Sequence, residues 1–126
     1  MHDKPQGRCS EDDVQYAAVM FSHDLTERKG HCVNLSNGAE VALFRYCGTP
    51  YAVSNICPHQ HSSVICKGMV SDGCVVCPMH GWTFRLYDGK CVSGETALLD
   101  VFRVIERGGI VYVEEPAEKT PAWMNW

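Results

Sequence analysis

The chain has 126 residues, of which 45% are apolar and 21% are charged, and its formal net charge at pH 7 is −4. A chain of this length can bury a core as one domain, and its apolar content excludes a disordered body. The acidic balance gives no basic footprint for nucleic acid, and no apolar run approaches the roughly 20 residues that span a bilayer.

Short strand-like segments separated by turn residues predict an all-β fold. The polar segment Met1–Asp13 is expected to be a flexible tail, and because it lacks the apolar core of an export signal we expect a cytoplasmic protein. The turn Ser36-Asn37-Gly38 predicts a hairpin between the second and third of four strands. These four expected strands are Val14–Phe21, His31–Leu35, Glu40–Tyr46 and Tyr51–Ile56.

The second half of the chain alternates between loops and hairpins. Cys57–Lys67 is expected to be a loop, and Ser71-Asp72-Gly73 predicts a hairpin within the next segment. The remaining expected strands are Trp82–Leu86, Val101–Glu106 and Ile110–Glu114, the last two joined by a Gly-Gly turn. Pro116–Trp126 is expected to be a C-terminal tail, whose aromatic end could pack on the domain or on a neighbouring subunit.

Two short motifs carry soft and imidazole ligands at a repeated spacing. They are Cys57-Pro58-His59 and Cys77-Pro78-Met79-His80, and 17 residues separate the first histidine from the second cysteine. Two thiolates and two imidazoles in alternating order suit a pair of irons, one held through sulfur and the other through nitrogen. Structural zinc sites usually group their cysteines, so the order disfavours a zinc-binding structural domain, which is kept as a further alternative.

The residues around these motifs resemble those of the Rieske [2Fe–2S] ferredoxin family. Gly81-Trp82 follows the second motif directly, and Phe84 and Asp88-Gly89 come soon after it. The resemblance covers about Tyr16 to Val113. It implies an antiparallel Rieske (ISP-like) β-sandwich or barrel over residues 14–115, with a small cluster-binding subdomain, about 57–94, inserted between strands.

The same resemblance implies one Rieske-type [2Fe–2S] cluster. Cys57 and Cys77 would hold the iron that stays ferric, and His59 and His80 would hold the iron that takes the electron. Electrons would enter and leave at the edges of these histidines. Residues expected to support the cluster or to form an apolar docking face around it are Pro58, His61, Pro78, Met79, Gly81 and Trp82.

Two of these residues have plainer interpretations. His61 lies two residues after a ligand and could respond to protons near the cluster, but a surface histidine without a role is also consistent with its position. Trp82, like Phe84, could simply pack in the core.

The resemblance also predicts a low reduction potential. High-potential Rieske proteins of respiratory complexes carry an extra cysteine in each ligand loop and a serine after the glycine of the second loop. The corresponding residues here are Ser62, Met79 and Trp82, none of which supplies that disulfide or hydroxyl. With fewer hydrogen bonds to the cluster, we expect a potential toward the end of the Rieske range near about −150 mV.

The chain shows no nucleotide-binding glycine pattern, catalytic triad or second metal motif, so we expect an electron-transfer component without a catalytic site of its own. Val41–Arg45 and Ser62–Ile65 resemble the small subunit of NAD(P)H-dependent nitrite reductase, whose partner would be a flavoprotein reductase or the sirohaem-containing large subunit. The alternative is the ferredoxin of an aromatic-ring-hydroxylating dioxygenase, with the terminal dioxygenase as partner. Neither assignment involves nucleic acid or a membrane.

Six cysteines lie outside the two motifs. In a reducing cytosol they are expected to be free thiols, mostly small buried side chains. They are Cys9, Cys32, Cys47, Cys66, Cys74 and Cys91.

Overall fold

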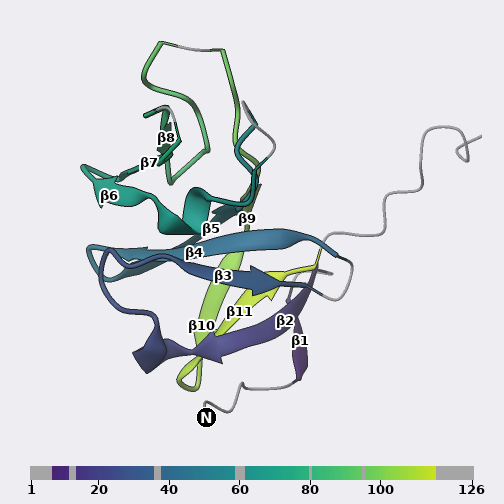
Figure 1. Ribbon diagram of the computed structural model, residues 1–126. Helices are drawn as coiled ribbons and strands as arrows, with labels where there is room; N and C mark the ends of the chain where they lie inside the picture. The colour runs from purple at the N-terminus through teal and green to yellow at the C-terminus, as the bar shows by residue number, and fades with distance from the viewer. Residues whose placement is uncertain are drawn as a thin grey trace, which may run out of the picture.

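The computed structural model describes residues 7–11, 14–35, 38–58, 62–79, 81–94 and 96–115. These residues form antiparallel strands with two short 3-10 turns, as the sequence predicts (Figure 1). The strands are β1 Arg8–Glu11, β2 Val14–Phe21, β3 His31–Asn34, β4 Glu40–Tyr46, β5 Thr49–Ser54, β6 Met69–Ser71, β7 Cys74–Val76, β8 Thr83–Arg85, β9 Val101–Phe102, β10 Val104–Arg107 and β11 Ile110–Glu114, and the turns are η1 Ser22–Asp24 and η2 Ile65–Lys67.

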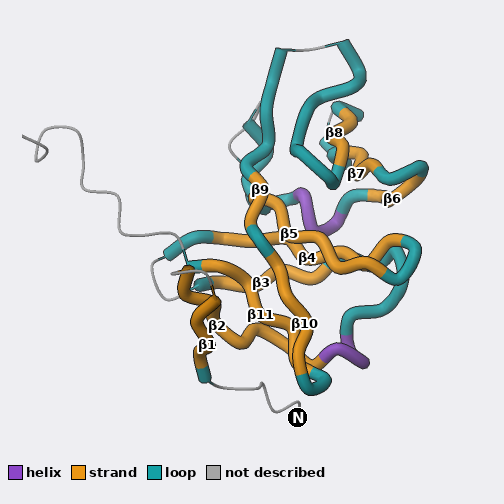
Figure 2. Tube along the Cα trace, turned by 180° about the vertical axis from the view of Figure 1, so that it is seen from behind, coloured by secondary structure: helices purple, strands orange, loops and turns teal. Residues whose placement is uncertain are grey.

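The strands form three sheets. The base sheet has the order β1-β2-β11-β10, the middle sheet β3-β4-β5-β9, and the tip sheet β6-β7-β8. Figures 1 and 2 show the tip sheet on the opposite side of the middle sheet from the base sheet. The tip sheet lies within residues 57–94 and therefore coincides with the part of the chain where an inserted subdomain is expected.

The central part of β4, in the middle sheet, is buried on both faces. Successive side chains of a strand point to opposite faces, and β4 sends Val41 and Leu43 into the core shared with the base sheet. Ala42 and Phe44 enter a second core, which lies beneath the tip sheet. All four residues are 0% exposed, which explains why β4 is a continuous apolar run rather than an alternating one.

Several predicted elements have the bounds expected from the sequence. β2 and β4 begin and end where the apolar pattern predicts. The β3–β4, β6–β7 and β10–β11 pairs are antiparallel, as their turn residues predict. Within the described parts of the chain, no helix is long and apolar enough to cross a membrane.

The amino-terminal segment departs from expectation. Residues 1–13 were expected to be a flexible tail, but Arg8–Glu11 form β1 and pair with β2 in register from Arg8 opposite Ala17 to Glu11 opposite Val14. β1 is an edge strand with mostly exposed side chains, so it carries no apolar alternation that sequence analysis could detect. Residues 1–6, 12–13 and the expected tail 116–126 lie outside the described residues.

The expected strand Val101–Glu106 is also wrong as a single element. It divides at Arg103, so that β9 pairs with β5 in the middle sheet and β10 pairs with β11 in the base sheet. The apolar pattern continues across the division because Phe102 on β9 and Val104 on β10 pack against the same hydrophobic core, the one between the base and middle sheets. Alternation alone therefore does not reveal that the chain changes sheets.

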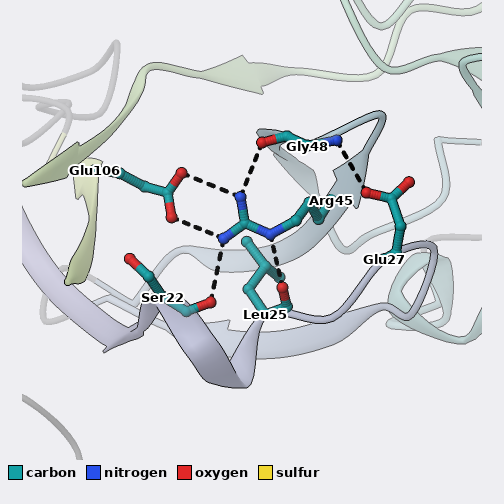
Figure 3. Close-up of polar contacts among 6 residues, drawn as sticks. All are labelled: Ser22, Leu25, Glu27, Arg45, Gly48 and Glu106. Carbon is teal, nitrogen blue, oxygen red and sulfur yellow. Dashed lines mark hydrogen bonds and ion pairs between the residues drawn. The ribbon is translucent and has the colours of Figure 1, made fainter.

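Arg45 on β4 ties the base sheet to the middle sheet (Figure 3). Its guanidinium donates to both carboxylate oxygens of Glu106 on β10, at 2.7 and 3.1 Å. It also donates to the carbonyls of Leu25, Gly48 and Ser22, at 2.7, 3.0 and 3.2 Å. The two charged side chains are only 15% and 29% exposed. The hydrogen bond from Arg45 is the main cause that lowers the pKa of Glu106, with partial burial opposing it.

Candidate metal centre

The described residues of the first motif, Cys57 and Pro58, come directly after Ile56, where the chain begins a connection that returns at Ser63. Ile56 and Ser63 face each other across the base of this connection as an isolated antiparallel bridge. The backbone N–H of Cys57 donates to the carbonyl of Ser62 at 2.9 Å. The motif cysteine is thus fixed at the point where the loop leaves the paired backbone.

The described residues of the second motif, Cys77, Pro78 and Met79, begin an equivalent connection that returns at Trp82. Val76 on β7 and Thr83 on β8 face each other across its base. The backbone N–H of Cys77 donates to the carbonyl of Trp82 at 2.8 Å, which is the same five-residue closure that the first loop shows. Gly81 donates in turn to the carbonyl of Cys77 at 3.0 Å and has a positive φ of 75°, a conformation that glycine adopts without strain.

The two hairpins bring Cys57 and Cys77 into one buried environment. Each cysteine is 1% exposed, and both belong to the core cluster beneath the tip sheet. The disulfide in the structure involves neither of them. Two buried sulfur donors at the ends of matching loops, in an apolar setting, fit the sulfur half of a two-cysteine, two-histidine cluster site.

The nitrogen half of the expected site, His59 and His80, lies outside the described residues, as does His61. Among the residues that are described, no group of three or more His, Cys, Asp or Glu side chains converges to hold a metal ion. The four-ligand assignment therefore stays a prediction, with the two cysteines placed in one buried cluster by the structure.

The expected docking residues differ in exposure. Pro78 and Gly81 are exposed, and Met79 is 48% exposed, whereas Pro58 is half-buried. Trp82 is also half-buried and packs against the same core cluster as the motif cysteines. Its ring centroid lies 6.4 Å from that of Phe84, which is 0% exposed. Phe84 is a core residue, and Trp82 is partly one.

Sequence analysis missed a disulfide in this region. Cys32 on β3 and Cys66 in η2 are bonded, with their Cα atoms 5.5 Å apart, so the expectation of free thiols is wrong for this pair. The two positions are 34 residues apart in sequence. They meet because Gly30 allows β3 to approach η2, since a Cβ at position 30 would lie 2.0 Å from the carbonyl oxygen of Cys66. No local sequence pattern signals that approach.

Comparison with known proteins decides the family. The sequence profile of the Rieske-like [2Fe–2S] domain matches residues 15–114. The chain belongs to the Rieske-like [2Fe–2S] family. Membership indicates a Rieske-type [2Fe–2S] cluster as the cofactor of this Rieske protein, and it favours iron over the zinc site that the motifs alone leave open.

Proteins similar to the chain include a small ferredoxin and a much longer desaturase. It is 29% identical over 112 residues to the ferredoxin component of an alkene monooxygenase system from Xanthobacter autotrophicus, covering 88% of this chain and 91% of that protein. It is 37% identical over 118 residues to cholesterol 7-desaturase nvd from Hemicentrotus pulcherrimus, covering 83% of this chain. The Rieske chain spans only 25% of the length of that desaturase.

A solved structure supports the same fold. A protein from Mycobacterium tuberculosis, assigned as the small subunit of an NADH-dependent nitrite reductase, superposes with a TM-score of 0.75 at 26% sequence identity, covering 89% of this chain and 99% of that one. The chain thus shares the fold of ferredoxin-type Rieske proteins. Its likenesses include both nitrite reductase small subunits and oxygenase ferredoxins.

Proposed function

We propose that this chain is a low-potential Rieske carrier that serves as the small subunit of NAD(P)H-dependent nitrite reductase, or as a carrier related to it. The observation that carries the proposal is the matched pair of hairpin loops, which places Cys57 and Cys77 in one buried cluster. The fold shared with the mycobacterial protein over almost its whole length supports the nitrite reductase assignment.

The residues of the chain divide the work at the cluster. Cys57 and Cys77 would hold one iron through sulfur, and His59 and His80 would hold the other through ring nitrogen. When bound, the cluster supplies reversible one-electron chemistry. The burial of the two cysteines keeps water from their sulfurs, because each is 1% exposed.

The chain also provides a place where a redox partner can meet it. Pro78 and Met79, which precede His80 in the sequence, are exposed. An electron carrier must bind and release its partners quickly, and such encounters bury small areas. An apolar patch of a few side chains around the histidines, rather than a broad interface, suits this use.

The proposed potential is low for a Rieske protein. Ser62 and Met79 cannot link the two loops by a disulfide, and Trp82 carries no hydroxyl that could bond to the cluster. Fewer hydrogen bonds to the cluster leave the extra negative charge of its reduced state less stabilised. We expect a midpoint potential toward about −150 mV.

A second candidate function is the ferredoxin of a ring-hydroxylating dioxygenase. The observation that favours it is the similarity to the ferredoxin subunit of 3-phenylpropionate/cinnamic acid dioxygenase from Shigella flexneri, which is 28% identical over 89 residues, covering 84% of that protein. In that case the partners would be a flavoprotein reductase and a terminal dioxygenase, with the same four ligands.

The cluster is tested by anaerobic purification followed by iron and sulfide analysis, with visible and EPR spectra before and after dithionite. Two irons and two sulfides per chain are expected, and Cys57→Ser or Cys77→Ser should abolish them. Cys74→Ser is the matched control, because Cys74 lies three residues before Cys77 on the same hairpin, and this variant should retain both iron and sulfide. A colourless, iron-free native protein would refute the proposal.

The partner is tested by mixing the dithionite-reduced protein with each candidate acceptor in a stopped-flow spectrometer. Oxidation by the sirohaem subunit that is at least tenfold faster than by a terminal dioxygenase is the expected result. The opposite order would replace the nitrite reductase assignment with the dioxygenase one.

A further inference from the structure

A buried polar side chain lies directly behind the first ligand loop. Asn55 is 2% exposed and stands two residues before Cys57, where β5 gives way to the loop. Elsewhere in the described part of the chain, the buried side chains are apolar, belong to cysteines or, in the case of Tyr16, carry a phenol. A polar group is retained in such a place when its hydrogen bonds hold something in position.

Asn55 joins the two ends of the segment that carries the first motif. Its side-chain Oδ1 accepts the N–H of Cys66 at 2.7 Å, and its backbone carbonyl accepts the N–H of Ile65 at 3.1 Å. Its own N–H donates to the carbonyl of Glu40 on β4 at 3.0 Å. One residue therefore fixes where the segment begins, where it ends and how both attach to the middle sheet.

A covalent bond secures the same junction. The disulfide joins Cys66 to Cys32 on β3, and the Nδ2 group of Asn55 lies 3.4 Å from the Cys32 sulfur as a donor. The backbone of Gly30 packs against the carbonyl of Cys66, with no room for a side chain. The end of the segment is thus held to β3 as well as to β5.

We propose that Asn55 is a positioning residue for the ligand loop of Cys57, and that the Cys32–Cys66 disulfide locks the position that Asn55 sets. The expected effect on the iron-sulfur cluster rests on the proposed function, whereas the expected effect on the protein structure around Asn55 does not. Cys57 enters the hydrophobic core beneath the tip sheet just after the end of β5, and the chain returns to this core at Ile65 and Cys66. A movement of Ile65 and Cys66 would therefore shift the ligand loop that connects them to Asn55.

Substitution of Asn55 by Leu tests the first half of the proposal. It fills a similar volume but leaves the buried N–H of Cys66 without its acceptor. We expect hydrogen exchange at the Cys66 amide to accelerate by at least tenfold and the half-life of the cluster in air to shorten by a similar factor. Asn55→Asp keeps an oxygen at the acceptor position and should restore much of the slow exchange.

The matched control is Arg45→Met, which destabilises the protein through the clamp between the base and middle sheets rather than through the ligand segment. The EPR g-values of the reduced cluster are compared in the three variants. A shift in Asn55→Leu that Arg45→Met does not produce supports positioning. Equal cluster lifetimes and unchanged g-values in the two variants would reduce Asn55 to a purely structural residue and overturn the proposal.

The disulfide is tested on the same footing with Cys32→Ser, using Cys9→Ser on β1 as the control. Alkylation of the denatured, unreduced wild-type protein, with the cluster removed, should modify two fewer cysteines than alkylation after reduction. Cys32→Ser should abolish that difference and shorten the cluster half-life severalfold, whereas Cys9→Ser should do neither. An unchanged half-life in Cys32→Ser would remove the locking role.

These readouts separate the two proposals. Amide exchange and alkylation can be measured on the protein without its cluster, so they report on the junction even if no iron is bound. An iron-free native protein with slow Cys66 exchange would refute the proposed function alone. Fast hydrogen exchange at the Cys66 amide of the wild-type protein, together with normal cluster binding, would refute the positioning role of Asn55 alone.

Discussion

Removal of the Arg45 clamp offers a direct test of how the base and middle sheets are held together. Arg45→Met keeps much of the aliphatic chain but deletes hydrogen bonds to three carbonyls and one carboxylate. Loss of one member of a well-buried ion pair costs about 3–5 kcal/mol, and hydrogen bonds to charged groups are worth about 1.5–3 kcal/mol each. Because Glu106 is 29% exposed and water can reach part of the site, we expect a loss of about 3 kcal/mol.

The assay is urea unfolding of the cluster-loaded protein under anaerobic conditions, followed by circular dichroism. In a separate thermal unfolding experiment, a loss of stability of this size should lower the melting temperature by roughly 10–15 °C in a domain of this size. Glu106→Gln keeps one acceptor oxygen and should cost only about 1 kcal/mol. The matched control is Arg107→Met, whose partner Glu11 is 43% exposed and whose own side chain is 56% exposed, so less than about 1 kcal/mol is expected.

The clamp also predicts a pH dependence with a definite sign. The pKa of Glu106 is lowered from its ordinary value of 4.5, chiefly by the hydrogen bond from Arg45. Its contribution to stability is therefore complete above pH 4.5 and is lost as the pH falls through the lower folded value. Glu106→Gln should remove this part of the acid dependence. If Arg45→Met proves no more costly than Arg107→Met, the reasoning from burial and hydrogen bonding fails.

Three further predictions concern the tip of the molecule and its cofactor. Gly89→Ala should lower the free energy of unfolding in urea by about 3 kcal/mol, because the φ of Gly89 is +76° and a Cβ would lie 1.8 Å from the carbonyl oxygen of Leu99. Gly109→Ala is the control, since its φ is +79° but no atom of the described residues lies near the added Cβ, and it should cost about 1 kcal/mol. Equal costs for the two variants would contradict the steric clash at Gly89. A hydrogen bond from Arg85 is the main cause that lowers the pKa of Asp88 to about 2, so Arg85→Gln should raise it toward 3.8 in an NMR titration, and a value still near 2 would assign the shift to the backbone donor instead. Removal of iron by a chelator should speed hydrogen exchange in the tip sheet while the base sheet stays protected, since the two pack in separate core clusters, and uniform loss of protection would show one cooperative unit.

Much of the fold follows from local sequence patterns. β2 and β4 are marked by their apolar residues, and the hairpins are marked by turn residues that adopt a positive φ, such as Gly73 and Gly108. The two motifs likewise predict the placement of Cys57 and Cys77 on paired loops. Local patterns suffice here because each of these features is determined by residues close to one another in the chain.

The features that sequence analysis missed depend on distant contacts. β1 is an edge strand whose pairing is stabilised by β2 and not by burial of its own side chains. The division at Arg103 depends on which sheet each half joins. The bond between Cys32 and Cys66 depends on the approach of β3 to η2, which only the tertiary fold creates. Each requires knowledge of a partner that the local pattern does not contain.

Because four consecutive residues of β4 are buried, this strand separates two hydrophobic cores and contributes side chains to both. Since side chains alternate across the strand, a shift of one position in its pairing would exchange the occupants of the two cores. The large Phe44 side chain would then face the base sheet, and the space beneath the tip sheet would receive Leu43 instead. Sequence change on this strand is therefore constrained from both sides at once, and evolution of new electron-transfer partners is expected to alter the outer loops while leaving this strand intact.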